Sequence, residues 1–234
     1  MIQRSYLLVD DNPEFLENLA EILLGTEAQV CTAASGTEAL EEARKRRFDA
    51  IVTDMRMPGM SGAEFVHQLR AFDTEVPVIL LSAYAADVQL RDARRDGLLA
   101  VLSKPSQIPR LLELLGKARR GGTIVIVEDD VALAENLTEA LNAHGLTVCT
   151  AGDLQEIEKI GVTPFAALVD LRVPGGPSGE GVSRVRARFP GARTVVITAY
   201  AHEAREYDAL FTKPFKTPEL LERLEAMYAE QGPQ

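Results

Sequence analysis

The residue with the clearest chemical potential is Asp54, a lone carboxylate between the apolar run Ala50–Thr53 and a turn at Pro58–Gly59. A short apolar run bounded by turn residues is typical of a buried strand, so Asp54 is expected at the carboxyl end of that strand. In open parallel sheets this edge is where ligands bind. A single aspartate at a strand end is more often structural than functional, so its role depends on what the chain places beside it.

Side chains of complementary chemistry follow other strand-like runs. Asp10 and Asp11 follow the first run, Ser82 ends a later one and Lys104 follows the last. Three carboxylates in one crevice repel one another, and a hard divalent cation such as Mg²⁺ relieves that repulsion. A lysine and a hydroxyl can hold phosphate oxygens, and a carboxylate can attack phosphorus to form an acyl phosphate. This set therefore predicts a site for a phosphoryl group.

Strand-like and helix-like segments alternate five times before residue 121, and this alternation positions the site. The first helix has Asn12 as its expected N-cap and Pro13 at its first position, and its apolar residues recur at helical spacing. The alternation predicts a parallel sheet with helices on both faces. Strands are expected at 6–9, 29–33, 50–53, 76–81 and 100–102, and helices at 13–24, 37–46, 63–71, 87–96 and 109–120.

The same pattern then restarts, so the chain is read as a tandem duplication. Matching segments lie 118 residues apart at the first two strands, 116 apart at the strand before Asp54 and 109 apart at the lysine. We expect two domains, 1–120 and 121–234, joined by the short segment Arg119–Gly122 and therefore close together. The second half repeats the chemical set, with a glutamate at the first position, as Glu128, Asp129, Asp170, Thr198 and Lys213.

Composition excludes several classes of protein. The net charge of −10 argues against nucleic acid as a partner, because phosphate contacts need a basic face. No apolar run approaches the length of about 18 residues that a membrane span needs, and no signal-peptide pattern opens the chain, so a cytoplasmic protein is expected. The two cysteines, Cys31 and Cys149, occupy matching strand positions and are expected in the two cores.

Both halves resemble the receiver domain of two-component response regulators. The resemblance covers nearly the whole chain and implies two flavodoxin-like (βα)5 domains of doubly wound α/β fold, with strand order 2-1-3-4-5. It implies that Asp54 and Asp170 accept phosphate from a histidine kinase or a phosphotransfer protein. It also implies phosphate binding by Ser82, Lys104, Thr198 and Lys213, and Mg²⁺ ligation by Asp10, Asp11, Asp54 and the Arg56 carbonyl, and by Glu128, Asp129, Asp170 and the Arg172 carbonyl.

Several positions depart from the family pattern. Val101 and Leu210 stand where the family usually has an aromatic switch residue, so signal transmission is expected to differ. Tyr84 and Tyr200 follow the hydroxyl positions by two residues, where they would either shield an acyl phosphate from water or simply cover the sheet edge. The second half has 15 residues between its hydroxyl and lysine positions against 22 in the first, which leaves at most one turn of its fourth helix.

These features favour a dual-receiver signalling protein that lacks a DNA-binding domain and acts through contacts with an unidentified protein target. Association as a homodimer is compatible with this interpretation. The principal alternative is a scaffold or adaptor that works without phosphorylation, and a fragment of a larger hybrid kinase or transcription factor is a further alternative. The chain is not expected to be an enzyme beyond its own phosphorylation and dephosphorylation. A carboxylate-nucleophile phosphatase would need a second acid where Arg56 and Arg172 stand.

Overall fold

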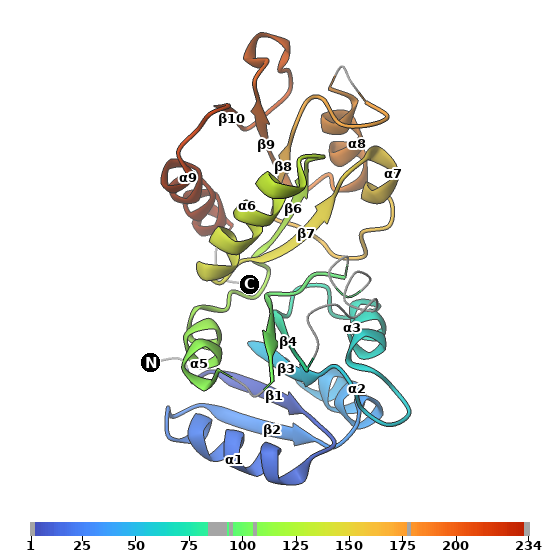
Figure 1. The fold of residues 1–234 in the computed structure, drawn as a ribbon, viewed down its shortest axis with the longest axis vertical. Coiled ribbons are helices and arrows are strands. Elements are labelled where there is room, and N and C mark those ends of the chain that lie inside the picture. The colour runs from blue at the N-terminus through green and yellow to red at the C-terminus, as the bar shows by residue number, and fades with distance from the viewer. Residues whose placement is uncertain (1–2, 84–92, 94–95, 105–106, 177–178, 232–234) are drawn as a thin grey trace.

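The computed structural model describes residues 3–83, 93, 96–104, 107–176 and 179–231, and contains two parallel five-stranded sheets (Figure 1). The strand orders are β2-β1-β3-β4-β5 and β7-β6-β8-β9-β10. The predicted doubly wound fold and its 2-1-3-4-5 order are therefore confirmed in both halves. The predicted helix over 87–96 lies for the most part outside the described residues.

The first half follows the predicted alternation closely. Two of its helices begin at side-chain caps that the structure shows clearly: Asn12 accepts a hydrogen bond from the backbone N–H of Phe15, and Ser61 forms a capping box with Glu64. Its elements are β1 (Ser5–Val9), α1 (Pro13–Leu24), β2 (Gln29–Ala33), α2 (Gly36–Lys45), β3 (Ala50–Asp54), α3 (Gly62–Arg70), β4 (Val78–Ser82), β5 (Ala100–Ser103) and α5 (Ile108–Lys117).

The second half repeats this order with two shorter helices. Helix α7 has four residues where α2 has ten, and a single 3₁₀ turn, η1, stands in the predicted place of the shortened fourth helix. Its elements are β6 (Thr123–Val127), α6 (Val131–Ala143), β7 (Thr147–Ala151), α7 (Leu154–Ile157), β8 (Ala166–Val169), α8 (Glu180–Arg188), β9 (Arg193–Thr198), η1 (Ala201–Glu203), β10 (Ala209–Thr212) and α9 (Thr217–Glu230).

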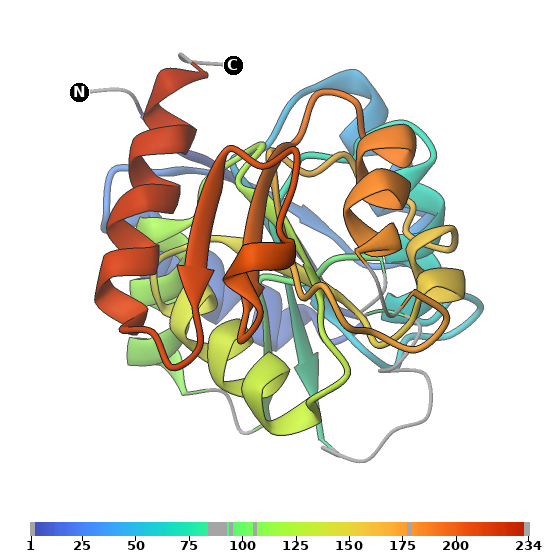
Figure 2. The same ribbon diagram turned by 90° about the horizontal axis from the view of Figure 1, so that it is seen from above.

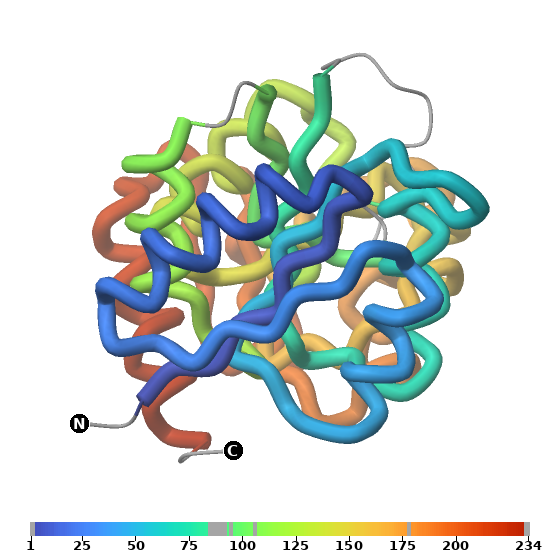
Figure 3. The backbone as a smooth tube through the Cα atoms, turned by 90° about the horizontal axis from the view of Figure 1, so that it is seen from below, coloured from blue at the N-terminus to red at the C-terminus, as the bar shows by residue number. Residues whose placement is uncertain are grey.

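Each sheet separates two apolar cores. In the first half, Leu7 and Val9 of β1 face the core under α2 and α3, whereas Tyr6 and Leu8 face the core under α1 and α5 (Figure 3). In the second half, α6 and α9 cover one face and α7 and α8 the other (Figure 2). The alternation of strand side chains and the coverage of both faces explain why these strands read as continuous apolar runs.

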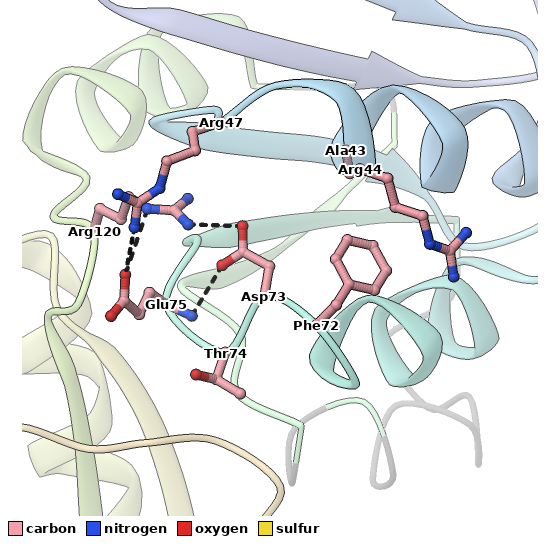
Figure 4. A pocket seen from close by; sticks show the side chains of 8 residues that line it. All are labelled: Ala43, Arg44, Arg47, Phe72, Asp73, Thr74, Glu75 and Arg120. Atoms are coloured by element: carbon pink, nitrogen blue, oxygen red, sulfur yellow. Dashed lines mark hydrogen bonds and ion pairs between the residues drawn. The ribbon is translucent and has the colours of Figure 1, made fainter.

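The two halves meet in a close joint, as the short linker predicted. Leu98 forms an antiparallel bridge with Val148 of the edge strand β7, and the backbone N–H of Arg119 donates to the Gly145 carbonyl at 3.1 Å. Arg120 lies in a hollow of the first half, where its guanidinium pairs with Asp73 at 2.8 Å (Figure 4). The linker is thus fixed to the first half by contacts of its own.

The cysteine prediction is correct for only one of the two thiols. Cys149 is fully buried, because the joint covers β7. Cys31 packs against its core but is only partly buried. It lies on the edge strand β2, which no described segment covers as the turn at Leu98 covers β7.

Candidate functional site

The first acidic cluster gathers at the carboxyl ends of β1, β3 and β5. The Lys104 ammonium group lies 2.7 Å from Asp10 Oδ2 and 2.8 Å from Asp54 Oδ1. Asp10 and Asp54 are buried, whereas Asp11 is exposed. The parallel sheet thus brings together four residues that the sequence singled out, although they span 94 residues of chain between Asp10 and Lys104.

Backbone donors orient the two buried carboxylates. Asp10 Oδ1 accepts a hydrogen bond from the N–H of Asn12 at 2.9 Å, and Asp54 Oδ2 accepts one from the N–H of Arg56 at 3.1 Å. Each acid therefore uses one oxygen for the chain that follows it and the other for Lys104. The side chains of Asp10 and Asp54 therefore have defined orientations. A catalytic group needs a fixed orientation to meet its reactant.

Lys104 has a protein environment that favours its charged form. Burial acts to lower the pKa of Lys104, but its hydrogen bonds and attraction to Asp10 and Asp54 outweigh burial and raise that pKa overall. The ammonium group also lies 5.0 Å from the centre of the Phe15 ring. Lys104 is therefore a stable cation at neutral pH.

Ser82 lies beside Lys104, and the helix after β3 approaches Asp54 closely. Ser82 is buried at the end of β4, and its carbonyl accepts the N–H of Lys104 at 2.9 Å. A Cβ at Gly62, the first residue of α3, would come within 2.2 Å of the Asp54 carbonyl oxygen. The start of α3 can lie this close to Asp54 because Gly62 has no side chain.

The acids of this cluster fit a divalent cation. One carboxylate oxygen from each of Asp10, Asp11 and Asp54 can be chosen so that all three lie within 4.8 Å of one another. Oxygen donors alone, two of them buried, suit Mg²⁺, whose ligands lie at about 2.1 Å. The donor set therefore fits the predicted ion, while the part assigned to the Arg56 carbonyl stays a prediction.

The second half builds the same arrangement from its own residues. Lys213 Nζ lies 2.6 Å from Glu128 Oε2 and 2.7 Å from Asp170 Oδ2. Glu128 and Asp170 are buried, and Asp129 is exposed, with ligand oxygens again within 4.8 Å. Thr198 is buried, and its hydroxyl accepts the N–H of Tyr200 at 3.1 Å.

Glu128, the longer acid at the first position, has a raised pKa. Burial raises the pKa of Glu128, and attraction to Lys213 only partly opposes this effect. The backbone N–H of Asp130 donates to its other oxygen at 3.3 Å. As with Lys104, burial acts to lower the pKa of Lys213, but Asp170 and Glu128 outweigh it and raise that pKa overall.

An arginine links two loops beside the second cluster. The Arg172 backbone N–H donates to Asp170 Oδ1 at 3.2 Å, while its guanidinium lies 3.4 Å from the centre of the Tyr200 ring. The same guanidinium pairs with Glu203 of η1 at 2.7 Å. We call these three side chains, Arg172, Tyr200 and Glu203, the arginine clasp.

Some sequence expectations fall outside what the structure tests. Tyr84 lies outside the described residues, whereas Tyr200 is exposed and stacks in the arginine clasp. Val101 and Leu210, at the aromatic switch position, are partly buried and pack against the cores. Phe15 beside Lys104 was not predicted, although the sequence shows an aromatic residue three positions after the Asn12 cap.

Comparisons with known proteins agree with this architecture. The sequence pattern of the response regulator receiver domain matches residues 6–116. A response regulator receiver protein of Anaeromyxobacter sp. (strain Fw109-5) is 51% identical over 232 residues, covering 98% of this chain and 97% of that protein. Sporulation initiation phosphotransferase F of Bacillus subtilis (strain 168) is 29% identical over 117 residues, covering 50% of this chain and 94% of that protein.

Solved structures resemble about half of the chain. The chemotaxis protein CheY4 of Vibrio cholerae has 32% identity and a TM-score of 0.45, covering 49% of this chain and 97% of that one. The receiver domain of a sensor histidine kinase from Pseudomonas aeruginosa PAO1, described with a magnesium ion in its active site cleft, has 30% identity and a TM-score of 0.45, covering 48% and 94%. Among the described helices, none combines the length and apolar character of a membrane span.

Proposed function

Because the chain belongs to the response regulator receiver family, a family of two-component signalling modules, we propose that it relays a signal by accepting a phosphoryl group on Asp54 and, in the second half, on Asp170. The observation that carries this proposal is the bridging of Asp10 and Asp54 by Lys104, with both distances below 3 Å. We further assign residues 1–120 and 121–234 to two receiver domains. Ordinary structural acids at strand ends would not need a shared cation.

The reaction follows from the positions of these groups. A carboxylate oxygen of Asp54 attacks the phosphorus of a phosphorylated histidine, so that a P–O bond forms and the P–N bond breaks. The electron pair of that bond returns to the imidazole ring. Lys104 and the Ser82 hydroxyl hold oxygens of the transferred group, because this chemistry depends mainly on position and charge neutralisation.

The metal completes the charge balance. Asp10, Asp11, Asp54 and the Arg56 carbonyl would hold Mg²⁺ in the first half, and Glu128, Asp129, Asp170 and the Arg172 carbonyl in the second. When bound, the ion neutralises the negative charge that gathers between the acids and the phosphoryl group.

The phosphoryl donor in this proposal is a histidine kinase or a phosphotransfer protein, and the output is a contact with another protein. The second site combines Asp170, Thr198 and Lys213 in the same roles. Tyr200, stacked on Arg172, shields the second acyl phosphate from water. We propose that the first half is the main acceptor, because the second half has only the 3₁₀ turn η1 in place of a fourth helix.

Acetyl phosphate with Mg²⁺ tests the assignment. Phosphate-affinity electrophoresis should show incorporation into the full chain, a large loss in Asp54→Asn, a smaller loss in Asp170→Asn and none left in the double variant. Incorporation that survives in the double variant would refute the acyl phosphate assignment. Incorporation lost only with Asp170→Asn would reverse the ranking of the two halves.

A scaffold that works without phosphorylation is the second candidate, and the arginine clasp favours it for the second half. An ion pair and a stacked ring beside Asp170 would keep this surface in one conformation. Beryllofluoride titration separates the two functions once a partner has been captured. A scaffold's partner affinity would stay constant, whereas a signalling receiver's affinity would change.

A further inference from the structure

The joint between the two halves consists of a turn seated on a sheet edge. Leu98, just before β5, bridges to Val148 of β7 and is only 4% exposed. A Cβ on Gly97 would lie 3.1 Å from Cys149 Sγ and 3.4 Å from Val162 Cγ1. The turn Gly97–Leu98 of the first half therefore covers the edge strand of the second half.

The duplication supplies a second copy of the turn. At the offset of 109 that relates the two lysines, Gly97 corresponds to Glu206 and Leu98 to Tyr207. Gly97 has φ of 81° and Glu206 has φ of 55°, a left-handed conformation that is unusual for a residue other than glycine. Both turns lead directly into the last strand of their sheet. Tyr207, however, is 42% exposed where Leu98 is buried.

The duplication also supplies a second copy of the edge. At the offset of 118, the β7 residues Thr147, Val148 and Cys149 correspond to Gln29, Val30 and Cys31 of β2. All three residues of β7 are buried, whereas Gln29 is exposed and the other two are partly exposed. Strands β2 and β10 lie toward opposite ends of the long axis (Figure 1). One copy of each surface is thus used inside the chain, and the other remains uncovered.

The exposed turn and the exposed edge carry opposite charges at two positions that are uncharged in the internal joint. Gly97 faces Val162 in the internal joint, and the counterparts of these residues are Glu206 and Arg46, the latter at the offset of 116. Arg46 belongs to the basic run Arg44–Arg47 at the end of α2, and its side chain pairs with Glu42 but stays 55% exposed, so it can reach a second carboxylate. A contact between apolar groups inside the chain would become an ion pair between chains.

The charges of the two halves favour the same pairing. Residues 1–120 carry 15 basic and 18 acidic residues, and residues 121–234 carry 10 and 17. The more acidic half carries the exposed turn, and the basic run lies beside the exposed edge. Complementary charge of this kind steers association and fixes which surfaces meet.

We propose that copies of this chain associate head to tail, with the turn at 205–208 of one copy seated on the β2 edge and the end of α2 of the next copy. The two surfaces differ, so the contact is heterologous and does not close on itself in a dimer. Assembly therefore continues to short filaments as the concentration rises. The contact is small and partly ionic, so it weakens with salt.

Sedimentation velocity over a wide range of concentration tests the proposal on the full chain. The average mass of the wild-type protein should rise past that of a dimer and fall on addition of salt. Tyr207→Asp and Arg46→Glu should each remain monomeric. Val131→Asp, which changes another exposed apolar residue, should behave as wild type. A wild-type protein that stays monomeric at every concentration overturns the proposal.

Mixing distinguishes a head-to-tail contact from a two-fold one. Tyr207→Asp retains an intact edge and Arg46→Glu retains an intact turn, so an equimolar mixture should form a heterodimer and stop there. Glu206→Arg combined with Arg46→Glu in one chain should restore filaments. A mixture that stays monomeric, or a wild-type protein that forms only closed dimers, overturns the proposal. Circular dichroism of each variant confirms that it is folded.

Discussion

Lys104 and Lys213 each offset the repulsion between two carboxylates, one pair in each half. Each ammonium group contacts two buried carboxylates, and the closest approaches range from 2.6 to 2.8 Å. Buried acids this close together are costly unless a positive charge lies between them. Both sheets contain the same lysine–carboxylate contacts. This repetition favours a role for these acids in the site over a role in the stability of the fold alone.

Replacing Lys104 with methionine should leave Asp10 and Asp54 without their shared cation. We expect the free energy of unfolding at neutral pH to fall by about 2 kcal/mol. The folded pKa of Lys104 is raised, so its contribution is complete below its ordinary pKa and is lost only as the pH rises through the raised value. Urea titration measures the loss.

Mg²⁺ provides the control for this variant. If the ion binds the same acids, it should restore more stability to Lys104→Met than to the wild-type protein. Lys45→Met, which removes an exposed lysine paired with Glu42, should change little with or without the ion. Equal effects of Mg²⁺ on both proteins would show that the cation does not bind between these carboxylates.

Glu128 gives the second half a pH dependence of its own. Its pKa is raised by burial, so the unfolded chain releases this proton at a lower pH than the folded chain. The wild-type protein therefore loses stability through Glu128 as the pH rises from the ordinary pKa of 4.5 to the raised value. Glu128→Gln should gain stability relative to wild type over this window, and the gain should level off above it.

Urea titrations at several pH values from acidic to neutral measure this difference. Glu135→Gln, which removes an exposed carboxylate of α6, is the matched control and should show no such trend. A difference between Glu128→Gln and wild type that stays constant across the window would mean that burial does not dominate the ionisation of Glu128.

At the scale of elements, local signals in the sequence predicted the helices and strands but not the order of the strands. The cap at Asn12 and the apolar runs predicted the start of α1 and the alternation of strands and helices, because each depends on neighbouring residues. The strand order came from the resemblance to the receiver family. The apolar runs also placed Asp54, Ser82 and Lys104 at one edge, since parallel strands end together. The site geometry was therefore predictable as a set, although its distances were not.

The strand boundary that was predicted wrongly depends on side-chain hydrogen bonds. The fourth strand was expected from Val76 but begins at Val78, because the Val76 carbonyl accepts Arg70 and its N–H donates to Asp73. Arg70, at the end of α3, also binds the carbonyls of Asp96 and Gly97. A buried arginine at a helix end looks like any solvated one in the sequence, so nothing local could have revealed this role.

Gly62 is the residue of α3 that approaches Asp54 most closely. Gly62→Ala would place a Cβ against the Asp54 carbonyl, so the start of α3 must move away from β3. We expect a loss of about 2 kcal/mol in the free energy of unfolding, and a large loss of phosphorylation by acetyl phosphate. Denaturant titration and phosphate-affinity electrophoresis measure the two effects.

Gly116→Ala is the matched control, because it lies in α5 with open space around its Cβ position. It should stabilise the protein by about 0.5 kcal/mol, since alanine restricts the unfolded chain and favours helix. Phosphorylation should be unchanged in this variant. If Gly62→Ala were as stable and as active as Gly116→Ala, the close approach to Asp54 would not matter.

At the scale of the whole molecule, the shortening of α7 explains why the two halves form one body. A helix of four residues in place of ten leaves β7 partly uncovered on its outer side, where the Gly97–Leu98 turn packs. The Tyr228 hydroxyl donates to the Arg120 carbonyl at 2.7 Å and adds a contact from α9. The second half therefore relies on the first to complete its core.

Cys149 reports on this dependence, and Cys31 is its internal control at the matching position of β2. Burial raises the pKa of Cys149 to about 12, and its sulfur lies under the Gly97 turn. Iodoacetamide should therefore modify Cys31 far faster than Cys149 in the native protein, as mass spectrometry of the peptides would show. Leu98→Asp should open the joint and raise the rate at Cys149 while leaving the rate at Cys31 unchanged. Similar native rates at both thiols, or a Leu98→Asp effect shared equally between them, would show that the joint does not protect β7.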